Sequence, residues 1–334
     1  MRKVSKRLKN EENGIFIISF DMELYWGVRD EISLKKYKKN LIGVHSFIPS
    51  ILKLFKRFDI HSTWAIVGFL FFKSKEHLIS NIPSKLPNYS NKNYSPYDYA
   101  FKMKANKFKD LYHFAPNLIE LINSYPNQEI ATHTFSHFYC LEKSQNLESF
   151  KLDLETAVNI AQKNKILIKS ITFPRNQINP QYFHILKEFG INQYRGNPLS
   201  WLYHTETWEK SSFLFRRIFQ FLDAYINITG HNTYNIKSIS NSILLNIAAS
   251  RFLYWYTKPI KYLETMKVKR ICSDLTYAAK RGEIYHLWAH PHNFGVNISE
   301  NLKLFRKIIK HYVHLREKYD MKSLNMSELA HYIR

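Results

Sequence analysis

The sequence has few cysteines and no long apolar run, and each absence argues against a class of protein. Cys140 and Cys272 are the only cysteines among 334 residues. Neither belongs to a CxxC pair, so they make no disulfide framework, which suits a reducing compartment. No stretch of 18 apolar residues is free of charge, so we expect no transmembrane helix. The basic N-terminal segment contains no apolar core, so we expect no secretory signal.

Acidic residues are also scarce. The chain has 49 Lys and Arg against 27 Asp and Glu, which gives a formal net charge of +22 at pH 7. The basic residues are scattered and no nucleic-acid-binding module is recognisable, so we do not expect a nucleic acid partner. An anionic substrate or a negatively charged membrane face suits such a surface. We expect a cytoplasmic protein, either free or peripheral on the inner face of the plasma membrane.

Strand and helix patterns alternate along the chain. Short β-branched and aromatic runs predict strands, and apolar residues at helical spacing predict the helices between them. The expected strands lie at 14–20, 61–67, 128–132, before Pro174, from 191 and within 282–295, and the helices at 44–58, 115–124, 147–163, 180–189 and 299–318. This order predicts an α/β fold in which helices surround parallel strands.

We expect one catalytic domain at 14–334, preceded by a basic tail at 1–13. Residues 200–282 interrupt the alternation and are interpreted as a mainly helical insertion. Its segment 211–229 has the pattern of a basic amphipathic helix, and a second helix is expected at 243–256. The first helix is either a hydrophobic lid or core helix, which is the safer interpretation, or a helix that lies in a membrane surface.

Two carboxylates follow the first strand. Asp21 and Glu23 are two residues apart, so on an extended chain they point to the same side while Met22 packs behind them. Carboxylates at the carboxyl end of a buried strand are typical of α/β active sites. A plainer interpretation is that Asp21 caps a turn and Glu23 is merely exposed.

Two histidines follow the strand at 128–132. His133 and His137 are four residues apart, which places both imidazoles on one side of a turn or helix. Two such imidazoles are half of a zinc site, although ordinary structural histidines also occur at this spacing. Arg175 and His290 also fall at the ends of predicted strands, and in a barrel these ends meet at one rim. The convergence predicts a hydrolytic metal site.

These motifs resemble those of the polysaccharide deacetylases of the nodulation-protein (NodB) type, carbohydrate esterase family 4. HTFSH at 133–137 matches the family's histidine motif, and SFDMELYWG resembles its aspartate motif. FPRNQ and HLWAHPHNF resemble the motifs that supply an arginine and a late histidine. The phrases THTFSHFYCLE, FPRNQ and HLWAHPHNF also resemble a subgroup associated with bacterial surface polysaccharide synthesis. The resemblance implies a distorted, incomplete (β/α) barrel of about seven parallel strands with the active site at their C-terminal ends.

The resemblance also implies roles for individual residues. Asp21 takes the position of the general base, Arg175 that of the arginine that orients it, and His290 that of the general acid. His133 and His137 take the positions of metal ligands. The family's second aspartate is replaced by Met22, so Glu23 is expected as the third ligand. The expected ion is Zn²⁺, with Co²⁺, Ni²⁺ and Mn²⁺ as alternatives.

Three further residues are candidates for substrate contact. His292 competes with His290 for the acid role, because the two lie two residues apart. Trp26 and Trp288 can form apolar walls for a sugar ring, although core packing is an equal alternative. His286 is expected to be a packed residue.

The predicted function is metal-dependent hydrolysis of an N-acetyl amide on a sugar during bacterial surface polysaccharide synthesis. One alternative is a deformylase or deacetylase of a lipid-linked sugar at the membrane surface. Another is a catalytically inactive, carbohydrate-binding relative. The expected partner is therefore an N-acetylated sugar or glycan, which can be anionic or lipid-linked.

Overall fold

The central element of the fold is β1 (Ile15–Met22), every residue of which is buried. The structure, a computed structural model, describes residues 12–104, 110–203, 213–239 and 243–333. β1 pairs in parallel with β2 (Ser62–Ile66) on one side and with β9 (Glu283–Ala289) on the other. A strand with neighbours on both edges and cover on both faces has no polar side, which explains its almost continuous apolar sequence.

The sheet continues from β1 through strands that follow one another in the sequence. Its order is β6-β9-β1-β2-β3-β4-β5-β7, with β10 against β1 and β8 against β9. Among the described residues every pairing is parallel except that of β6 with β9. The remaining strands are β3 (Gln128–Thr132), β4 (Ser170–Thr172), β5 (Gln193–Arg195), β6 (Tyr234–Asn235), β7 (Leu245–Asn246), β8 (Arg251–Phe252) and β10 (Lys322–Ser323).

One extended segment, residues 245–253, bridges the two ends of this curled sheet. The backbone N–H of Ile247 donates to the carbonyl of Tyr194 in β5, at 2.9 Å. A few residues on, the N–H of Ser250 donates to the carbonyl of His286 in β9, at 2.8 Å. When residues 245–253 are counted as one strand and β10, off this path, is left out, seven parallel strands of the described residues surround the centre. The stretches over which this segment pairs with β5 and with β9 are short. The predicted distorted (β/α) barrel is confirmed.

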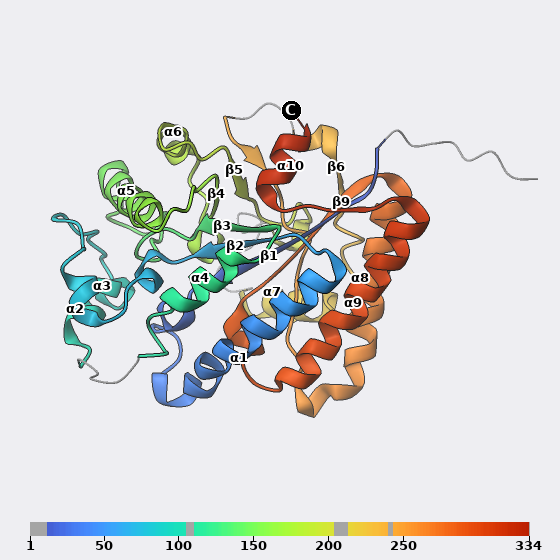
Figure 1. Cartoon of the computed structure of the whole chain (residues 1–334), viewed down its shortest axis with the longest axis horizontal. Coiled ribbons are helices and arrows are strands. Elements are labelled where there is room, and N and C mark those ends of the chain that lie inside the picture. Colours follow the sequence, from blue (N-terminus) through green and yellow to red (C-terminus); the bar gives the residue numbers. More distant parts are fainter. Residues whose placement is uncertain (1–11, 105–109, 204–212, 240–242, 334) are drawn as a thin grey trace, which may run out of the picture.

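Helices surround the sheet. Figure 1 shows α1, α8 and α9 on one side of the molecule and α5 and α6 on the other, with β1 and β9 between them. The helices are α1 (Leu34–Phe58), α2 (Lys75–Ile79), α3 (Pro96–Lys102), α4 (Pro116–Ser124), α5 (Leu147–Lys163), α6 (Phe183–Glu188), α7 (Phe213–Asp223), α8 (Glu264–Arg281), α9 (Ile298–Tyr319) and α10 (Met326–Ile333). Short 3₁₀ turns connect many of them: η1 (Leu24–Gly27), η2 (Gly68–Phe71), η3 (Lys92–Tyr94), η4 (Pro174–Asn176), η5 (Pro180–Tyr182), η6 (Trp201–Tyr203), η9 (Ile236–Ile239), η10 (Lys258–Leu263) and η11 (Pro291–Phe294).

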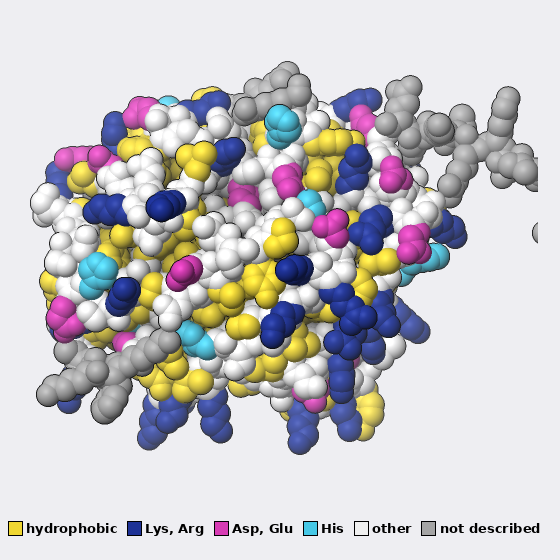
Figure 2. All heavy atoms as spheres, viewed as in Figure 1, with side chains coloured by type: hydrophobic (Ala, Val, Ile, Leu, Met, Phe, Trp, Pro, Cys, Tyr) yellow, Lys and Arg dark blue, Asp and Glu magenta, His cyan; other side chains and the backbone are white. Residues whose placement is uncertain are grey.

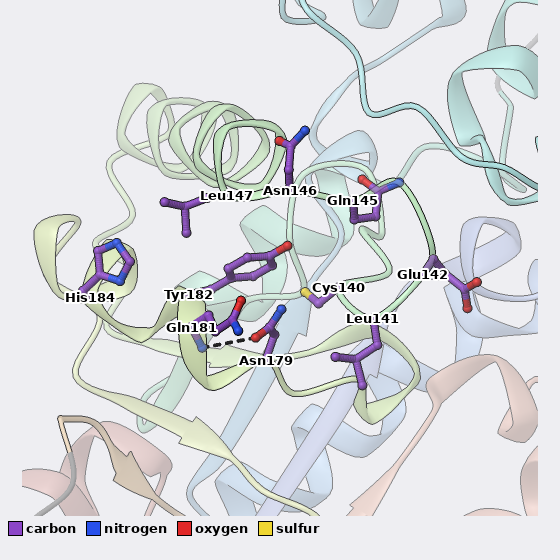
Figure 3. Close-up of a pocket in the computed structure, with 10 residues that line it drawn as sticks. All are labelled: Cys140, Leu141, Glu142, Gln145, Asn146, Leu147, Asn179, Gln181, Tyr182 and His184. Carbon is purple, nitrogen blue, oxygen red and sulfur yellow. Dashed lines mark hydrogen bonds between the residues drawn. The ribbon is translucent and has the colours of Figure 1, made fainter.

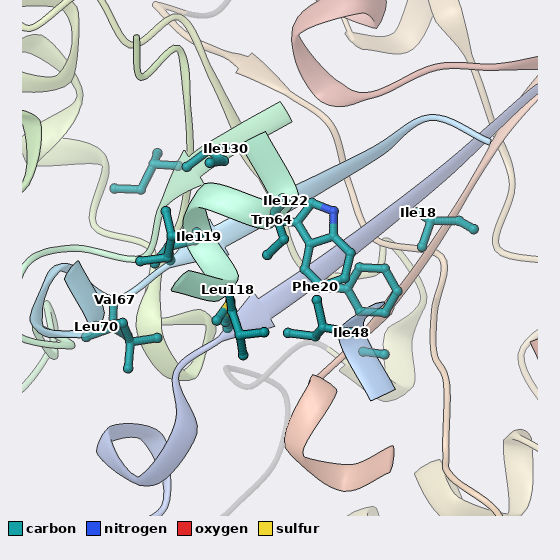
Figure 4. Close-up of a cluster of buried hydrophobic side chains, with 14 of the residues drawn as sticks. Ile18, Phe20, Ile48, Trp64, Val67, Leu70, Leu118, Ile119, Ile122 and Ile130 are labelled. Atoms are coloured by element: carbon teal, nitrogen blue, oxygen red, sulfur yellow. The ribbon is translucent and has the colours of Figure 1, made fainter. Parts of the chain in front are cut away.

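The main hydrophobic core lies between the sheet and helices α1, α4 and α9. Phe20 of β1 stacks on Trp64 of β2, with ring centroids 4.3 Å apart and an interplanar angle of 20° (Figure 4). Ile48 of α1 and Ile119 of α4 belong to the same buried cluster. The core therefore holds the carboxyl end of β1 in place, and Asp21 and Glu23 of the candidate site lie there.

The segment 200–282 is built differently from the expectation. It contains α7 and α8, but β6, β7 and β8 also come from it and join the main sheet. The helix expected at 243–256 is wrong, because this stretch is extended where it bridges β5 and β9. The call of a basic tail at 1–13 falls almost wholly on residues 1–11, which lie outside the described residues.

Positive charge is spread over the helices. Figure 2 shows many Lys and Arg side chains at the lower edge and right side of the face where α1, α8 and α9 lie. Within the described residues, no helix combines the length and the apolar character needed to cross a bilayer.

Candidate metal centre and catalytic site

Asp21 lies near the carboxyl end of β1 and is held by an arginine from another strand. Arg195, at the end of β5, donates from Nη1 to Oδ1 at 2.7 Å and from Nη2 to Oδ2 at 2.6 Å. Burial alone would raise the pKa of Asp21, but the Arg195 charge and other contacts outweigh it and hold the pKa far below its usual value. Asp21 is therefore an ionised carboxylate with a defined orientation, as a general base requires.

Glu23 follows β1 directly and faces two histidines of one loop. Its Oε2 lies 3.2 Å from Nε2 of His133 and 3.0 Å from Nε2 of His137. All three side chains are buried, and their candidate ligand atoms lie within 4.8 Å of one another. One carboxylate and two imidazoles are a common protein ligand set for a catalytic zinc ion, with a further position left for water or substrate.

The histidine loop, residues 133–137, is a turn with two strained positions rather than a helix. Thr134 and His137 both have left-handed backbone angles, with φ of 62° and 60°. The carboxylate of Asp153, in α5, accepts hydrogen bonds from two consecutive N–H groups of the loop at 2.7 and 3.1 Å. These contacts offset the strain and turn both imidazoles toward β1.

The protonation of His133 indicates a place for a cation. Its Nδ1 lies 2.8 Å from the carbonyl oxygen of Thr172. The hydroxyl of Thr172 lies 2.7 Å from the same nitrogen. In the tautomer that donates from Nδ1 to the carbonyl, Nε2 presents a lone pair to Glu23. Two lone pairs 3.2 Å apart repel each other unless a cation or a second ring proton lies between them. The donor set therefore fits a divalent metal ion, with the second ring nitrogen oriented as in known sites.

Two further histidines reach the site from the turn after β9. Nε2 of His290 lies 3.5 Å from Oδ2 of Asp21 and 3.9 Å from Oε1 of Glu23, and Nε2 of His292 lies 3.8 Å from the same Oε1. Glu23 and these two histidines also form a group that could hold a cation. His290 is partly exposed toward the cavity whereas His292 is buried, which favours His290 as a proton donor to a bound substrate.

The surroundings separate the pKa values of these histidines. Burial lowers the pKa of His290, but the charges of Glu23 and Asp21 outweigh it, so its pKa is raised above 6.5. For His137 and His292, burial wins and lowers the pKa to about 4 and about 3. Among these three imidazoles, His290 is therefore the one whose protonated form its surroundings favour, while burial favours the neutral form of the other two. Such a division is typical of sites that combine an acid with metal ligands.

A cavity of about 840 Å³ opens over these groups. Asp21, Glu23 and His290 lie in its lining, and Trp288 is part of the wall. Residues of α7 form another part of the wall. The space is large enough for one or more sugar units, since ligand cavities commonly measure a few hundred to a thousand Å³.

The expected contact between Arg175 and Asp21 is wrong. Arg175 instead donates to the carboxylates of Asp30 and of Glu31, the latter at 3.3 Å. It lies in η4, past the end of β4, and has a left-handed backbone angle, with φ of 54°. Arg175 still lines the cavity, but Arg195 occupies the position beside the base.

The two tryptophans also differ in position, since one lies in the core and the other at the cavity. Trp26 is fully buried, packs edge-on against Phe69 with ring centroids 4.8 Å apart, and donates to the carbonyl of His113. It is a core residue and not a cavity wall. Trp288 lines the cavity, and the Arg195 guanidinium lies 4.2 Å from its ring centroid. His286 is buried and hydrogen-bonded to Ser19, as expected for a packed residue.

A second cavity, of about 670 Å³, lies on the other side of the histidine loop. Tyr182 and Cys140 lie in its lining, and Asn179 accepts a hydrogen bond from the backbone N–H of Gln181 there (Figure 3). Its Glu142 and His184 lie at opposite ends (Figure 3). Among the residues drawn, no set of side chains converges as in the first cavity.

No family model and no curated protein matches this sequence. Among solved structures, the chain is similar to a protein from Mycobacterium smegmatis assigned as a polysaccharide deacetylase. The identity is 13%, the coverage 97% of this chain and 92% of that one, and the TM-score 0.59. A second similar structure is a protein from Pseudomonas aeruginosa PAO1 with the same assignment, at 9% identity, 96% and 91% coverage, and a TM-score of 0.52.

A third similar structure is the Puue allantoinase, at 8% identity, 97% and 91% coverage and a TM-score of 0.52. At such identities the likeness is one of fold. The chain therefore has the fold of the polysaccharide deacetylases, which confirms the architecture that the motifs imply.

The sequence interpretation missed Arg195 and Asp153. Arg195 ends the short strand of INQYRG, so the rule that functional side chains follow strand ends could have found it. Asp153 lies inside an amphipathic helix, and nothing in the sequence marks it as the residue that holds the histidine loop.

Proposed function

We propose that the protein is a metal-dependent hydrolase that removes an N-acetyl group from a sugar. The observation that carries this proposal is the meeting of Glu23, His133 and His137 around one point, beside Asp21 and His290. A metal group, a base and an acid in one cavity are what hydrolysis of an unactivated amide requires. The shared fold supports the same conclusion.

In the proposed reaction, Glu23, His133 and His137 hold a divalent ion, for which zinc is the first candidate. A bound ion of this kind lowers the pKa of water and stabilises the negative charge that develops on the amide oxygen. The carboxylate of Asp21 accepts the proton of the attacking water, and Arg195 keeps that carboxylate ionised and oriented. His290 donates a proton to the departing sugar nitrogen.

The cavity supports a carbohydrate substrate. Its volume of about 840 Å³ is sufficient for one or more sugar units, and Trp288 offers a flat apolar surface against which a sugar ring can pack. We infer that the substrate is an N-acetylated glycan of the bacterial cell surface, because the motif resemblance points to the subgroup associated with its synthesis.

The proposal is tested with zinc-loaded protein and N-acetylglucosamine oligomers, by measuring the release of free amine and acetate. We expect release that Asp21→Asn abolishes while the metal content stays at one per chain. Glu23→Gln should lose the metal as well, because it removes the carboxylate ligand.

Wild-type protein that binds one metal ion but hydrolyses no acetylated or formylated sugar would contradict the proposal. If it still bound the oligomers, the inactive carbohydrate-binding relative would be the better description. Absence of any metal binding by the wild-type protein would contradict the ligand assignment itself.

A further inference from the structure

Helix α7 turns its polar side to the cavity and its apolar side to solvent. Arg216 and Gln220 line the cavity. Four apolar side chains of α7, between 37% and 64% exposed, recur at spacings of three or four residues: Phe215, Ile218, Phe219 and Leu222. Ile226, three residues past the end of α7, is 52% exposed. Helices of globular proteins normally bury such a face against the core. In α7 the apolar face is exposed instead. We name this exposed face the α7 patch, and its exposure indicates a partner that covers it.

Exposed aromatic side chains occur in η6 and η10. Gln220, near the C-terminal end of α7, donates to the carbonyl of Leu202 in η6 at 3.2 Å, and Trp201 in η6 is 54% exposed. The ring centroid of Phe221, the next residue of α7, lies 5.4 Å from that of Tyr254. In η10, which follows Tyr254, Tyr262 is 79% exposed. Exposed Trp and Tyr beside an apolar helix are typical of protein surfaces that meet a membrane interface.

Among the described residues, the exposed charges within α7 and η10 are positive, and Glu264, which follows η10, pairs with Lys267 at 2.9 Å. The one carboxylate of α7, Asp223, is buried and accepts a hydrogen bond from Arg251 at 2.9 Å. η10 contains no acidic residue and carries the exposed Lys258 and Lys261. A second copy of the chain would bring its own positive charge against this surface, whereas anionic lipids would neutralise it.

We propose that the α7 patch docks on an anionic lipid bilayer, with α7 lying in the plane of the interface. Because α7 forms a wall of the cavity, docking would place the cavity beside the lipid headgroups. A substrate carried by a membrane lipid would then reach the site without leaving the bilayer surface. The docking surface is independent of the proposed hydrolysis, because it requires neither metal nor substrate.

The test is flotation of the full chain with vesicles of phosphatidylglycerol and of phosphatidylcholine. We expect the protein to float with phosphatidylglycerol at low salt, less so at high salt, and little with phosphatidylcholine. The double change Ile218→Ser and Phe219→Ser should weaken the partition by at least about tenfold, because two large apolar side chains no longer enter the interface.

A matched control changes two apolar residues of similar exposure elsewhere, Ile42→Ser and Leu167→Ser. This variant should float like the wild type, and circular dichroism should show that both variants are folded. The proposal is overturned if the wild type does not float, or if both double variants lose binding equally. It is also overturned if the α7 patch change converts a dimer into a monomer without altering flotation, since a second copy would then be the occupant.

Discussion

Arg195 and Arg175 differ in what their guanidinium groups contact, although both follow short strands at the same rim. Arg195 makes a buried bidentate pair with Asp21, and Arg175 pairs with Asp30 and Glu31 at the cavity wall. A planar guanidinium that holds both carboxylate oxygens fixes the orientation of the carboxylate as well as its charge. The orientation of the base therefore depends on Arg195.

Replacement of Arg195 by lysine should separate these two contributions. Arg195→Lys keeps the charge but loses the paired hydrogen bonds, so we expect the hydrolysis rate to fall by about 10–100-fold with the metal content unchanged. Rates and metal content measured on the same preparation check this. Arg175→Lys is the matched control. An equal loss of hydrolysis rate in both variants would show that the orienting role does not belong to Arg195.

The pH dependence should report His290. Its pKa is raised above 6.5 because the negative charges of Glu23 and Asp21 favour the protonated ring over the cost of burial. In the proposed reaction the protonated ring is the acid, so kcat should fall as the pH rises through this raised pKa. Since the pKa of Asp21 is held far below neutral, protonation of the base should not limit the rate near pH 5.

His290→Asn should lower kcat by about 10²–10⁴-fold and remove the alkaline decline. A pH–rate profile of both proteins provides the measurement. An unchanged alkaline limb in the variant would transfer the acid role to another group, and His292→Asn then becomes the variant to compare.

At the scale of the elements, helix α5 positions the candidate metal ligands His133 and His137 through the backbone of their loop. Asp153 accepts hydrogen bonds from two backbone N–H groups of the histidine loop, and the loop holds two left-handed residues. A loop strained in this way keeps its shape only while the surrounding contacts persist. The geometry of His133 and His137 therefore depends on α5, a helix that contributes no ligand to the candidate site.

Asp153→Ala should reduce both stability and metal affinity. Three buried donors, two backbone N–H groups and the Ser136 hydroxyl, would lose their acceptor. We therefore expect the free energy of unfolding to fall by about 2–4 kcal/mol and metal affinity by about 10–100-fold. Denaturant unfolding and metal titration measure the two effects. Glu155→Ala, an exposed position two residues further along α5, should change neither; a matching loss there would indicate a general effect on the helix.

At the scale of the whole molecule, the candidate ligands come from two segments that lie near the beginning and near the end of the first 140 residues. Glu23 follows β1 and the histidine loop follows β3, so an ion bound between them ties strand ends that are separated by more than 100 residues. A ligand that binds the folded state alone stabilises it in proportion to its affinity and concentration. Metal should therefore act on the stability of the whole barrel.

Removal of the metal with a chelator should lower the melting temperature by roughly 5 °C, the value expected when free metal exceeds its Kd about a thousandfold. Calorimetry of the metal-loaded and chelated protein measures the shift. Glu23→Gln should melt at one temperature with or without the chelator. A shift that persists in this variant would place the stabilising ion elsewhere.

Much of the fold could be predicted from local sequence patterns. The bounds expected for β3 and α5 agree with the structure, because a short apolar run after a turn and a long amphipathic repeat each have one stable local form. The pattern at 243–256 was misleading. Its residues are apolar enough for a helix, yet the open edges of β5 and β9 offered backbone partners that only the assembled sheet provides.

For the candidate site, too, some features follow from the local sequence and others only from the folded structure. The sequence by itself determined the kinds of groups present and their place after strands: Asp21, Glu23, His133, His137 and His290 follow apolar runs, and parallel strands must end at one rim. Only the tertiary structure decided which arginine reaches Asp21, that Trp26 is core, and that α7 exposes its apolar face. Those outcomes depend on side-chain reach and on packing between distant segments, and local propensity carries no information about either.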